Sequence, residues 1–118
     1  MLQNAKLKNL FKLSGKVTLY IPSTVNINED IDNRKYIDEA ASLLSRCFGG
    51  ATSCQTLGYW MSPSAGLVKE RTVMVYAYCT DEDLQKHAEE VIDYCESLKK
   101  ELKQDSIAME INGEMYFI

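Results

Sequence analysis

The stretch from Gly49 to Tyr78 constrains the fold most, because it separates two helical patterns and itself has the pattern of two strands. Residues 51–61 alternate small or polar side chains with larger ones, which is typical of a strand at the edge of a sheet. Residues 67–79 carry apolar side chains on both faces, which indicates a central strand. A turn rich in serine, with a proline and a glycine, joins the two. The sequence therefore predicts a β-hairpin in the middle of the chain.

A helix is predicted on each side of this hairpin. The first begins near Asp32 or Asn33, either of which can cap it, and repeats apolar residues at helical spacing until Gly49 ends it. The second begins after Thr80, with three acidic residues in its first turn and lysines in its last turn, as the helix dipole favours. Each helix has one apolar stripe, so each needs a surface to cover.

Further strands are predicted at both ends of the chain. Residues 16–22 are rich in β-branched and aromatic side chains and stop at a proline, and residues 106–111 and 114–118 flank Asn112-Gly113, a strong hairpin signal. The order is then strand, helix, strand, strand, helix, strand, with one strand added. Two single-striped helices must lie on one face of an antiparallel sheet. The sequence predicts an α+β, ferredoxin-like βαββαβ sandwich with an extra C-terminal hairpin strand.

Length and composition favour one folded domain over residues 1–118. Residues 1–15 form a basic amphipathic segment before an α+β core over residues 16–118. This segment either packs on the domain or frays, or else it docks on a membrane surface or a partner. Because no signal-peptide or membrane-spanning pattern is present in the sequence, we expect a cytoplasmic protein that does not bind membranes.

Charge and cysteine content exclude further classes. The net charge of −4 argues against direct nucleic-acid binding, which needs a basic surface. The four cysteines form no Cys-x-x-Cys pair and the chain has one histidine, so no metal and no cofactor are expected. Three of the cysteines occupy apolar positions, which predicts buried free thiols in a reducing compartment.

The common catalytic patterns are missing from the sequence. It has no glycine-rich phosphate loop and no Gly-x-Ser-x-Gly elbow. His87 lies at the margin of the second helix's apolar stripe, which favours a flanking histidine over one paired with a cysteine. Glu89, Glu90, Asp93 and Glu96 have the spacing of a solvated face, with docking to a basic groove as the alternative. We therefore predict a protein that is not an enzyme, with Glu70 as an acid or base as the remaining enzymatic hypothesis.

Binding residues are instead predicted around the central turn and on the uncovered sheet face. Aromatic and arginine side chains dominate binding hot spots, and they occur on both sides of the turn. The alternative is structural, with the tryptophan plugging the sheet edge and the charges preventing unwanted strand pairing. The candidate partner- or ligand-binding residues are Tyr59, Trp60, Lys69, Glu70, Arg71, Tyr76 and Tyr78.

Gly58-x-Trp60, followed by Gly66-Leu67-Val68-Lys69-Glu70, resembles a motif of a bacterial family of small ferredoxin-like domains of unknown function. The chain departs from that family in Tyr59 between the glycine and the tryptophan and in a longer loop. The resemblance implies the same fold and no established activity. In overall style the chain is also similar to accessory proteins of phages and plasmids of Gram-positive bacteria, some of which inhibit host defence systems.

Two functions follow as hypotheses. The first is a non-enzymatic protein-binding accessory factor, such as a mobile-element inhibitor of a host defence system of the anti-CRISPR kind. The alternative is a small-molecule-binding domain whose pocket lies at the Trp60/Glu70 sheet edge. A homodimer formed through the open sheet face fits both hypotheses.

Overall fold

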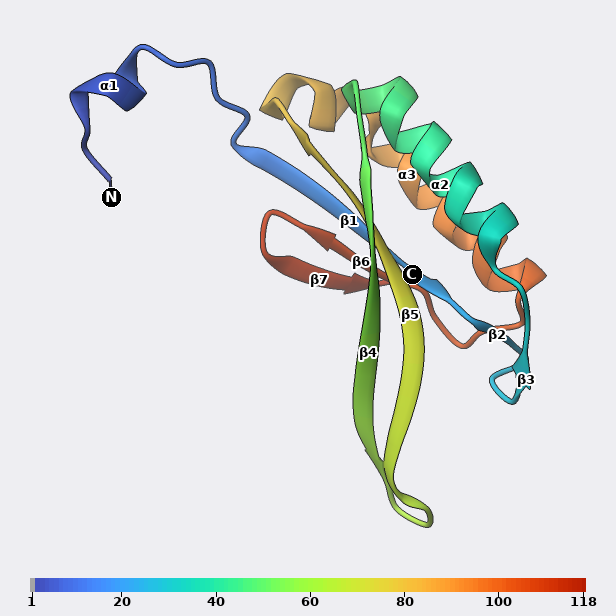
Figure 1. Ribbon diagram of the computed structural model, residues 1–118. Coiled ribbons are helices and arrows are strands. Elements are labelled where there is room, and N and C mark those ends of the chain that lie inside the picture. Colours follow the sequence, from blue (N-terminus) through green and yellow to red (C-terminus); the bar gives the residue numbers. More distant parts are fainter. Residues whose placement is uncertain (1) are drawn as a thin grey trace.

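The computed structural model describes residues 2–118, so Met1 of the predicted N-terminal segment lies outside the described residues. A five-stranded antiparallel sheet has the strand order β4-β5-β1-β6-β7. Two long helices lie side by side on one of its faces (Figure 1). The elements are α1 (Ala5–Lys8), β1 (Gly15–Pro22), β2 (Thr24–Val25), β3 (Glu29–Asp30), α2 (Arg34–Phe48), β4 (Thr52–Ser62), β5 (Gly66–Cys79), α3 (Asp81–Glu101), β6 (Ala108–Ile111) and β7 (Glu114–Phe117).

The predicted ferredoxin-like α+β sandwich is confirmed. Its four common strands are β1, β4, β5 and β6, and β7 extends the sheet as the added hairpin strand. The β6–β7 turn is Asn112-Gly113, and both residues have positive φ, 52° and 85°. A two-residue turn of this kind matches the twist of the strands that it joins. β4 lies at the sheet edge and β5 lies inside the sheet, as their side-chain patterns predict.

The helix ends follow from local chemistry. The Thr80 hydroxyl accepts a hydrogen bond from the Asp83 backbone N–H at 3.0 Å and caps α3. Gly49 ends α2 in the left-handed conformation, with φ of 94°. The Tyr94 hydroxyl donates to the Tyr36 carbonyl oxygen at 3.1 Å and ties α3 to α2. The two helices are therefore fixed to each other by a polar contact as well as by packing.

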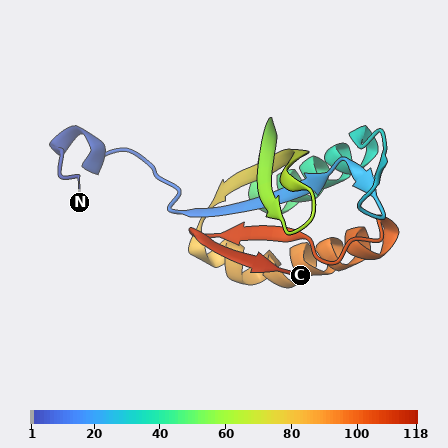
Figure 2. The same cartoon turned by 90° about the horizontal axis from the view of Figure 1, so that it is seen from below.

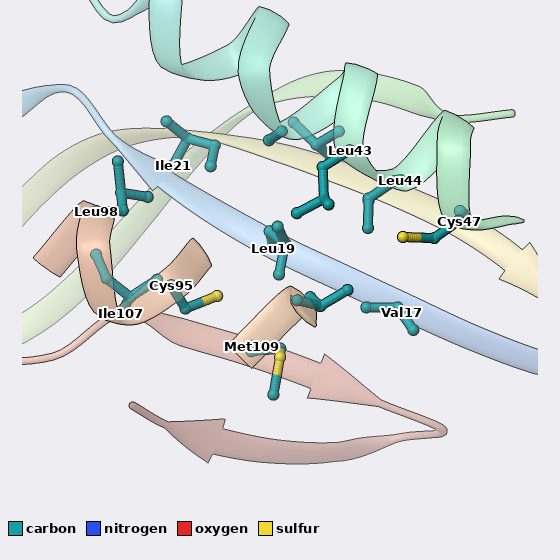
Figure 3. Close-up of a cluster of buried hydrophobic side chains, with 14 of the residues drawn as sticks. Val17, Leu19, Ile21, Leu43, Leu44, Cys47, Cys95, Leu98, Ile107 and Met109 are labelled. Carbon is teal, nitrogen blue, oxygen red and sulfur yellow. The ribbon is translucent and has the colours of Figure 1, made fainter. Parts of the chain in front are cut away.

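The core lies between the helices and the sheet (Figure 3). Alternate residues of β1 point into it, namely Val17, Leu19 and Ile21, and none is more than 1% exposed. Leu44 from α2 and Leu98 from α3 meet them from the helix layer. Cys47, Cys79 and Cys95 are buried and Cys54 is exposed, so three of the four cysteines are buried free thiols as predicted.

Within residues 2–118, no helix lies over the opposite face of the sheet (Figure 1). Residues paired across antiparallel strands share a face, so the register places Thr18, Tyr20, Met74, Tyr76 and Tyr78 there. Thr18 is nevertheless fully buried on this face. The Lys16 ammonium lies 4.7 Å from the Tyr76 ring centroid and 5.4 Å from that of Tyr78, so a cation covers part of this aromatic surface.

Two segments extend from the compact core. The β4–β5 hairpin continues well beyond the helices, and the exposed N-terminal segment with α1 projects away from the sheet (Figure 1, Figure 2). The segment after Pro22 contains the short β2–β3 ladder, which the sequence pattern does not predict. Its turn contains Asn26 and Ile27, both with positive φ. These local hydrogen bonds and backbone angles leave no periodic trace in the sequence.

Candidate functional site

A cavity of about 1010 Å³ lies where the open sheet face meets the β2–β3 ladder. Its floor is formed by side chains of β1 and β5, including Tyr20, Val68 and Thr72. One wall is the segment from Ser23 to Ile31, and another is the connection from α3 to β6. Ligand sites of small proteins commonly have this concave shape and mixed lining. The fold thus brings three distant parts of the chain around one hollow.

Trp60 and Glu70 line this cavity as a hydrogen-bonded pair. The Trp60 Nε1–H donates to Glu70 Oε1 at 3.2 Å. Gly58 pairs with Glu70 and Val68 with Trp60, so the tryptophan and the glutamate are diagonal neighbours on the open face. The indole stays 46% exposed. Nearly half of the Trp60 surface is therefore accessible to solvent beside the Glu70 carboxylate.

Hydrogen bonds hold the walls in place. The Ser23 hydroxyl donates to the Arg71 carbonyl oxygen at 2.6 Å, which fixes the β1–β2 connection to β5. The Gln104 side-chain amide donates to the Thr24 carbonyl oxygen at 2.9 Å, which fixes the end of α3 to the β2–β3 ladder. Asn26 N–H donates to the Leu102 carbonyl oxygen at 2.8 Å. The hollow is therefore built by specific polar contacts between its walls.

Ile27 lines this cavity with an unusual backbone conformation. Its φ of 70° lies in the left-handed region, which a β-branched residue rarely adopts. The side chain is 42% exposed at the cavity wall. Such strain persists where the surrounding structure enforces it, and it is concentrated at binding and catalytic sites. A residue in this conformation therefore lies on the wall of the cavity.

The seven predicted site residues separate into groups. Trp60, Lys69, Glu70 and Arg71 line the cavity, with Lys69 and Arg71 on the strand face opposite to Glu70. Tyr59 also faces away from Trp60 and is 57% exposed.

Tyr76 and Tyr78 lie elsewhere on β5. Tyr76 follows Glu70 by six residues, which is about 20 Å along a strand. Its ring contacts Tyr78 edge-on at a centroid distance of 6.1 Å. These two tyrosines therefore form a second surface, separate from the cavity.

Sequence reasoning missed much of the cavity lining. Ser23 and Thr24 stand in a polar segment after β1, where turn formation explains serine and threonine as well as ligand binding does. Gln104 carried no signal, because it follows the last turn of α3 among lysines and acids. Tyr20 and Thr72 belong to ordinary strand alternation. Only the tertiary arrangement brings them to one place.

No helix in the described part of the chain is long and apolar enough to cross a membrane. No protein-family model and no curated protein matches the sequence. The resemblance to domains of unknown function therefore stays a prediction.

Solved structures do resemble the chain. A phage SAM lyase in complex with S-methyl-5'-thioadenosine matches it with a TM-score of 0.64 at 17% identity, over 93% of this chain and 92% of that one. The phage SAM lyase in its apo state matches with a TM-score of 0.62 at 17% identity, over 93% and 95%. The likeness is one of fold. It extends over nearly the whole of both chains, which agrees with the α+β sandwich described above.

Proposed function

We propose that the protein binds a small molecule in the cavity around Trp60 and Glu70. The observation that carries the proposal is the Trp60–Glu70 pair, joined at 3.2 Å on the wall of a hollow of about 1010 Å³. This volume is at the upper end of what ligand pockets use. The pair offers a flat aromatic face beside a carboxylate. A ligand that combines a planar ring with a positive charge satisfies both groups.

S-adenosylmethionine has this chemistry, and its uncharged thioether S-methyl-5'-thioadenosine has the planar ring without the positive charge. The purine is a planar ring that can stack on an indole, and the sulfonium and ammonium groups are cations that a carboxylate attracts. The structurally similar phage SAM lyase holds S-methyl-5'-thioadenosine. This supports adenosine thioethers, and the sulfonium from which they derive, as the ligand class proposed for this cavity.

The test is calorimetric titration of the full chain with S-adenosylmethionine and with S-methyl-5'-thioadenosine, together with fluorescence of the single tryptophan. We expect both ligands to change the Trp60 emission. Glu70→Gln should weaken S-adenosylmethionine binding by about ten- to one-hundredfold, because hydrogen bonds and ion pairs to a charged group contribute about 1.5–3 kcal/mol. The same variant should affect the uncharged thioether much less.

Matched controls separate the site from general damage. Glu96→Gln removes an exposed acid from α3, on the other side of the sheet, and should bind normally. Tyr59→Phe changes the neighbour of Trp60 that lies on the other face of β4, and this variant should bind normally. Trp60→Leu should abolish binding. Absence of heat and of a fluorescence change at millimolar ligand would refute the proposal. Analysis of the same samples for S-methyl-5'-thioadenosine formed from S-adenosylmethionine also tests turnover, with Glu70 as the acid or base.

A second candidate function is favoured by the outer face of the β4–β5 hairpin, which is the face opposite to Trp60 and Glu70. Four large apolar side chains share that face and are 47–71% exposed, because the hairpin continues beyond α2 and α3 (Figure 1). Lys69 and Arg71 of β5 lie on the same face, where they pair with Tyr59 and Leu57 of β4. This apolar stripe consists of Leu57, Tyr59, Met61 and Leu67. A contiguous exposed apolar surface flanked by cations supports the hypothesis of a protein-binding accessory factor, including an inhibitor of a host system.

Native mass spectrometry of the protein purified gently from its source cells tests this second function. A specific partner, or a second copy of the chain, should be retained by the unmodified protein and lost in Met61→Glu. Thr52→Glu places the same charge on the same strand near the helix-covered end and should keep the partner. If the unmodified chain carries no macromolecule, or if both variants retain it, the stripe does not hold the partner.

A further inference from the structure

Three side chains of different chemistry meet between the two helices. Cys47 comes from the last turn of α2, and His87 and Glu90 come from α3. One ligand atom of each, a sulfur, a ring nitrogen and a carboxylate oxygen, lies within 4.8 Å of the other two. The Cys47 thiol donates to Glu90 Oε2 at 3.4 Å. The cluster is remote from the Trp60–Glu70 cavity, because it lies in the helix layer on the other side of the sheet.

The neighbours of these side chains hold them in a defined arrangement. Cys47 is 6% exposed, and Figure 3 shows its side chain projecting from α2 beside Leu44. The Phe48 ring meets the His87 imidazole edge-on, with centroids 5.9 Å apart and an interplanar angle of 88°. His87 and Glu90 are three residues apart on a helix, so they share a face. The sulfur is thus nearly buried, and the imidazole has a ring packed against it.

A solvent route reaches the cluster at Glu90. This residue is exposed and lines a groove between α2 and α3 together with Arg46 and Tyr94. An ion can therefore enter from the groove, and water can occupy a coordination position that the protein leaves open. A structural zinc site is usually closed by four protein ligands, whereas a three-ligand site keeps such a position.

We propose that Cys47, His87 and Glu90 bind a divalent transition-metal ion of the zinc class. A thiolate, an imidazole and a carboxylate are the ligand types that zinc uses, and the soft sulfur disfavours magnesium and calcium. Zinc–ligand bonds of about 2.0–2.3 Å place tetrahedral ligand atoms about 3.3–3.8 Å apart. The three ligand atoms lie within 4.8 Å of one another, which exceeds the spacing around a bound zinc ion by about 1 Å. Rotation of the Glu90 and His87 side chains can close this difference. When the ion binds, the Cys47 thiol releases its proton to solvent and the sulfur forms a bond to the metal.

The sequence alone argues against this site, because its cysteines lack ligand spacing and His87 lies at the edge of an apolar stripe. That reasoning applies to ligands on one element. Here the ligands come from two helices, and 43 positions separate Cys47 from Glu90 in the sequence. A bound ion would join the end of α2 to α3, so it would stabilise the helix layer in addition to any chemistry at its open position.

Cobalt titration of the purified full chain, treated first with a chelator, tests the proposal. We expect one Co²⁺ per chain, with thiolate-to-cobalt charge-transfer absorption and the visible bands of a tetrahedral site, and displacement by Zn²⁺. Cys47→Ser should remove the charge-transfer absorption, and Cys54→Ser, which changes the exposed cysteine, should leave it unchanged. Zn²⁺ should raise the thermal midpoint of the unmodified chain but not that of Cys47→Ser.

Two further variants keep the test decisive if Cys47→Ser does not fold. His87→Gln and Glu90→Gln retain the thiol and should each weaken Co²⁺ binding at least tenfold, with unchanged far-ultraviolet circular dichroism. Absence of a cobalt spectrum in the unmodified chain would overturn the proposal. So would a cobalt spectrum that persists in Cys47→Ser, or a Co²⁺ affinity in both glutamine variants equal to that of the unmodified chain. In those cases the cluster is a buried thiol hydrogen-bonded to a carboxylate.

Discussion

Thr18→Val should make the protein more stable. Thr18 is fully buried on the open face of β1, between its paired neighbours Tyr76 on β5 and Glu110 on β6. Its hydroxyl has no hydrogen-bond partner within residues 2–118. Burying an unpaired hydroxyl costs about 1–3 kcal/mol. Valine has the same shape without the hydroxyl and an equal preference for strands, so the substitution removes this cost without leaving a cavity.

We expect the free energy of unfolding to rise by about 1–2 kcal/mol. For a chain of this length that corresponds to about 4–8 °C in the thermal midpoint, from an unfolding entropy of about 2 cal/mol/K per residue. Urea titration followed by circular dichroism gives the second measurement. The midpoint should rise by about 0.5–1 M with an unchanged slope.

Thr56→Val is the matched control. The Thr56 hydroxyl on β4 lies 3.0 Å from the Thr72 carbonyl oxygen and 2.6 Å from the Thr72 hydroxyl. Replacing Thr56 by valine removes its hydrogen bonds to Thr72 and should lower the free energy of unfolding by about 1 kcal/mol. If Thr18→Val is destabilising to a similar extent, the Thr18 hydroxyl has a partner in solution and the reasoning is wrong.

Three more predictions follow from the backbone and the titratable groups. Ile27→Asn should raise the free energy of unfolding by up to about 1 kcal/mol, because asparagine tolerates positive φ better than a β-branched residue does. Urea titration measures the change, and a loss of stability would mean that Ile27 is not strained. Iodoacetamide at pH 8 should modify one thiol of the metal-free native chain and four thiols in urea. Burial raises the pKa of Cys47 to about 11, that of Cys95 to about 12 and that of Cys79 above its ordinary value, so these thiols react slowly in the folded chain. Mass spectrometry counts the adducts, and rapid modification of more than one thiol in the native chain would contradict the burial. Hydrogen bonds and charge from Arg34 lower the pKa of Asp32 from 3.8 to about 2, so this carboxylate contributes stability above about pH 4 that is lost as the pH falls toward 2. Asp32→Asn should therefore reduce the dependence of the thermal midpoint on pH between about pH 4 and about pH 2. An unchanged pH dependence would show that the ion pair is not formed in solution.

Most of the fold could be predicted because its signals are local. Thr80 and Gly49 mark helix ends through their own side-chain or backbone chemistry, and Asn112-Gly113 fixes a hairpin. Alternation along β4 and β5 distinguishes an edge strand from a central one. The βαββαβ order then limits the topology, since each helix has one stripe to bury. The β2–β3 ladder escaped prediction because it has only two residues in each strand.

The site could be predicted only in part, because its parts meet through tertiary structure. Trp60 and Glu70 lie on one hairpin, so strand alternation and a single turn are enough to relate them. Gln104 reaches the cavity from the end of α3, and Tyr20 from the sheet floor. The Cys47–His87–Glu90 cluster depends on how two helices align, and no pattern within either helix specifies that alignment.

The β4–β5 hairpin links the two proposed functions and also allows them to be separated. A strand places successive side chains on opposite faces, so Trp60 and Glu70 face the cavity while Tyr59, Met61 and Leu67 face outward. Substitutions one residue apart therefore affect different surfaces without changing the backbone. Loss of ligand binding in Glu70→Gln with the partner retained, and the reverse in Met61→Glu, would assign one function to each face. If both variants lose both functions, the hairpin acts as one unit, and ligand and partner compete for or cooperate through the same strand pair.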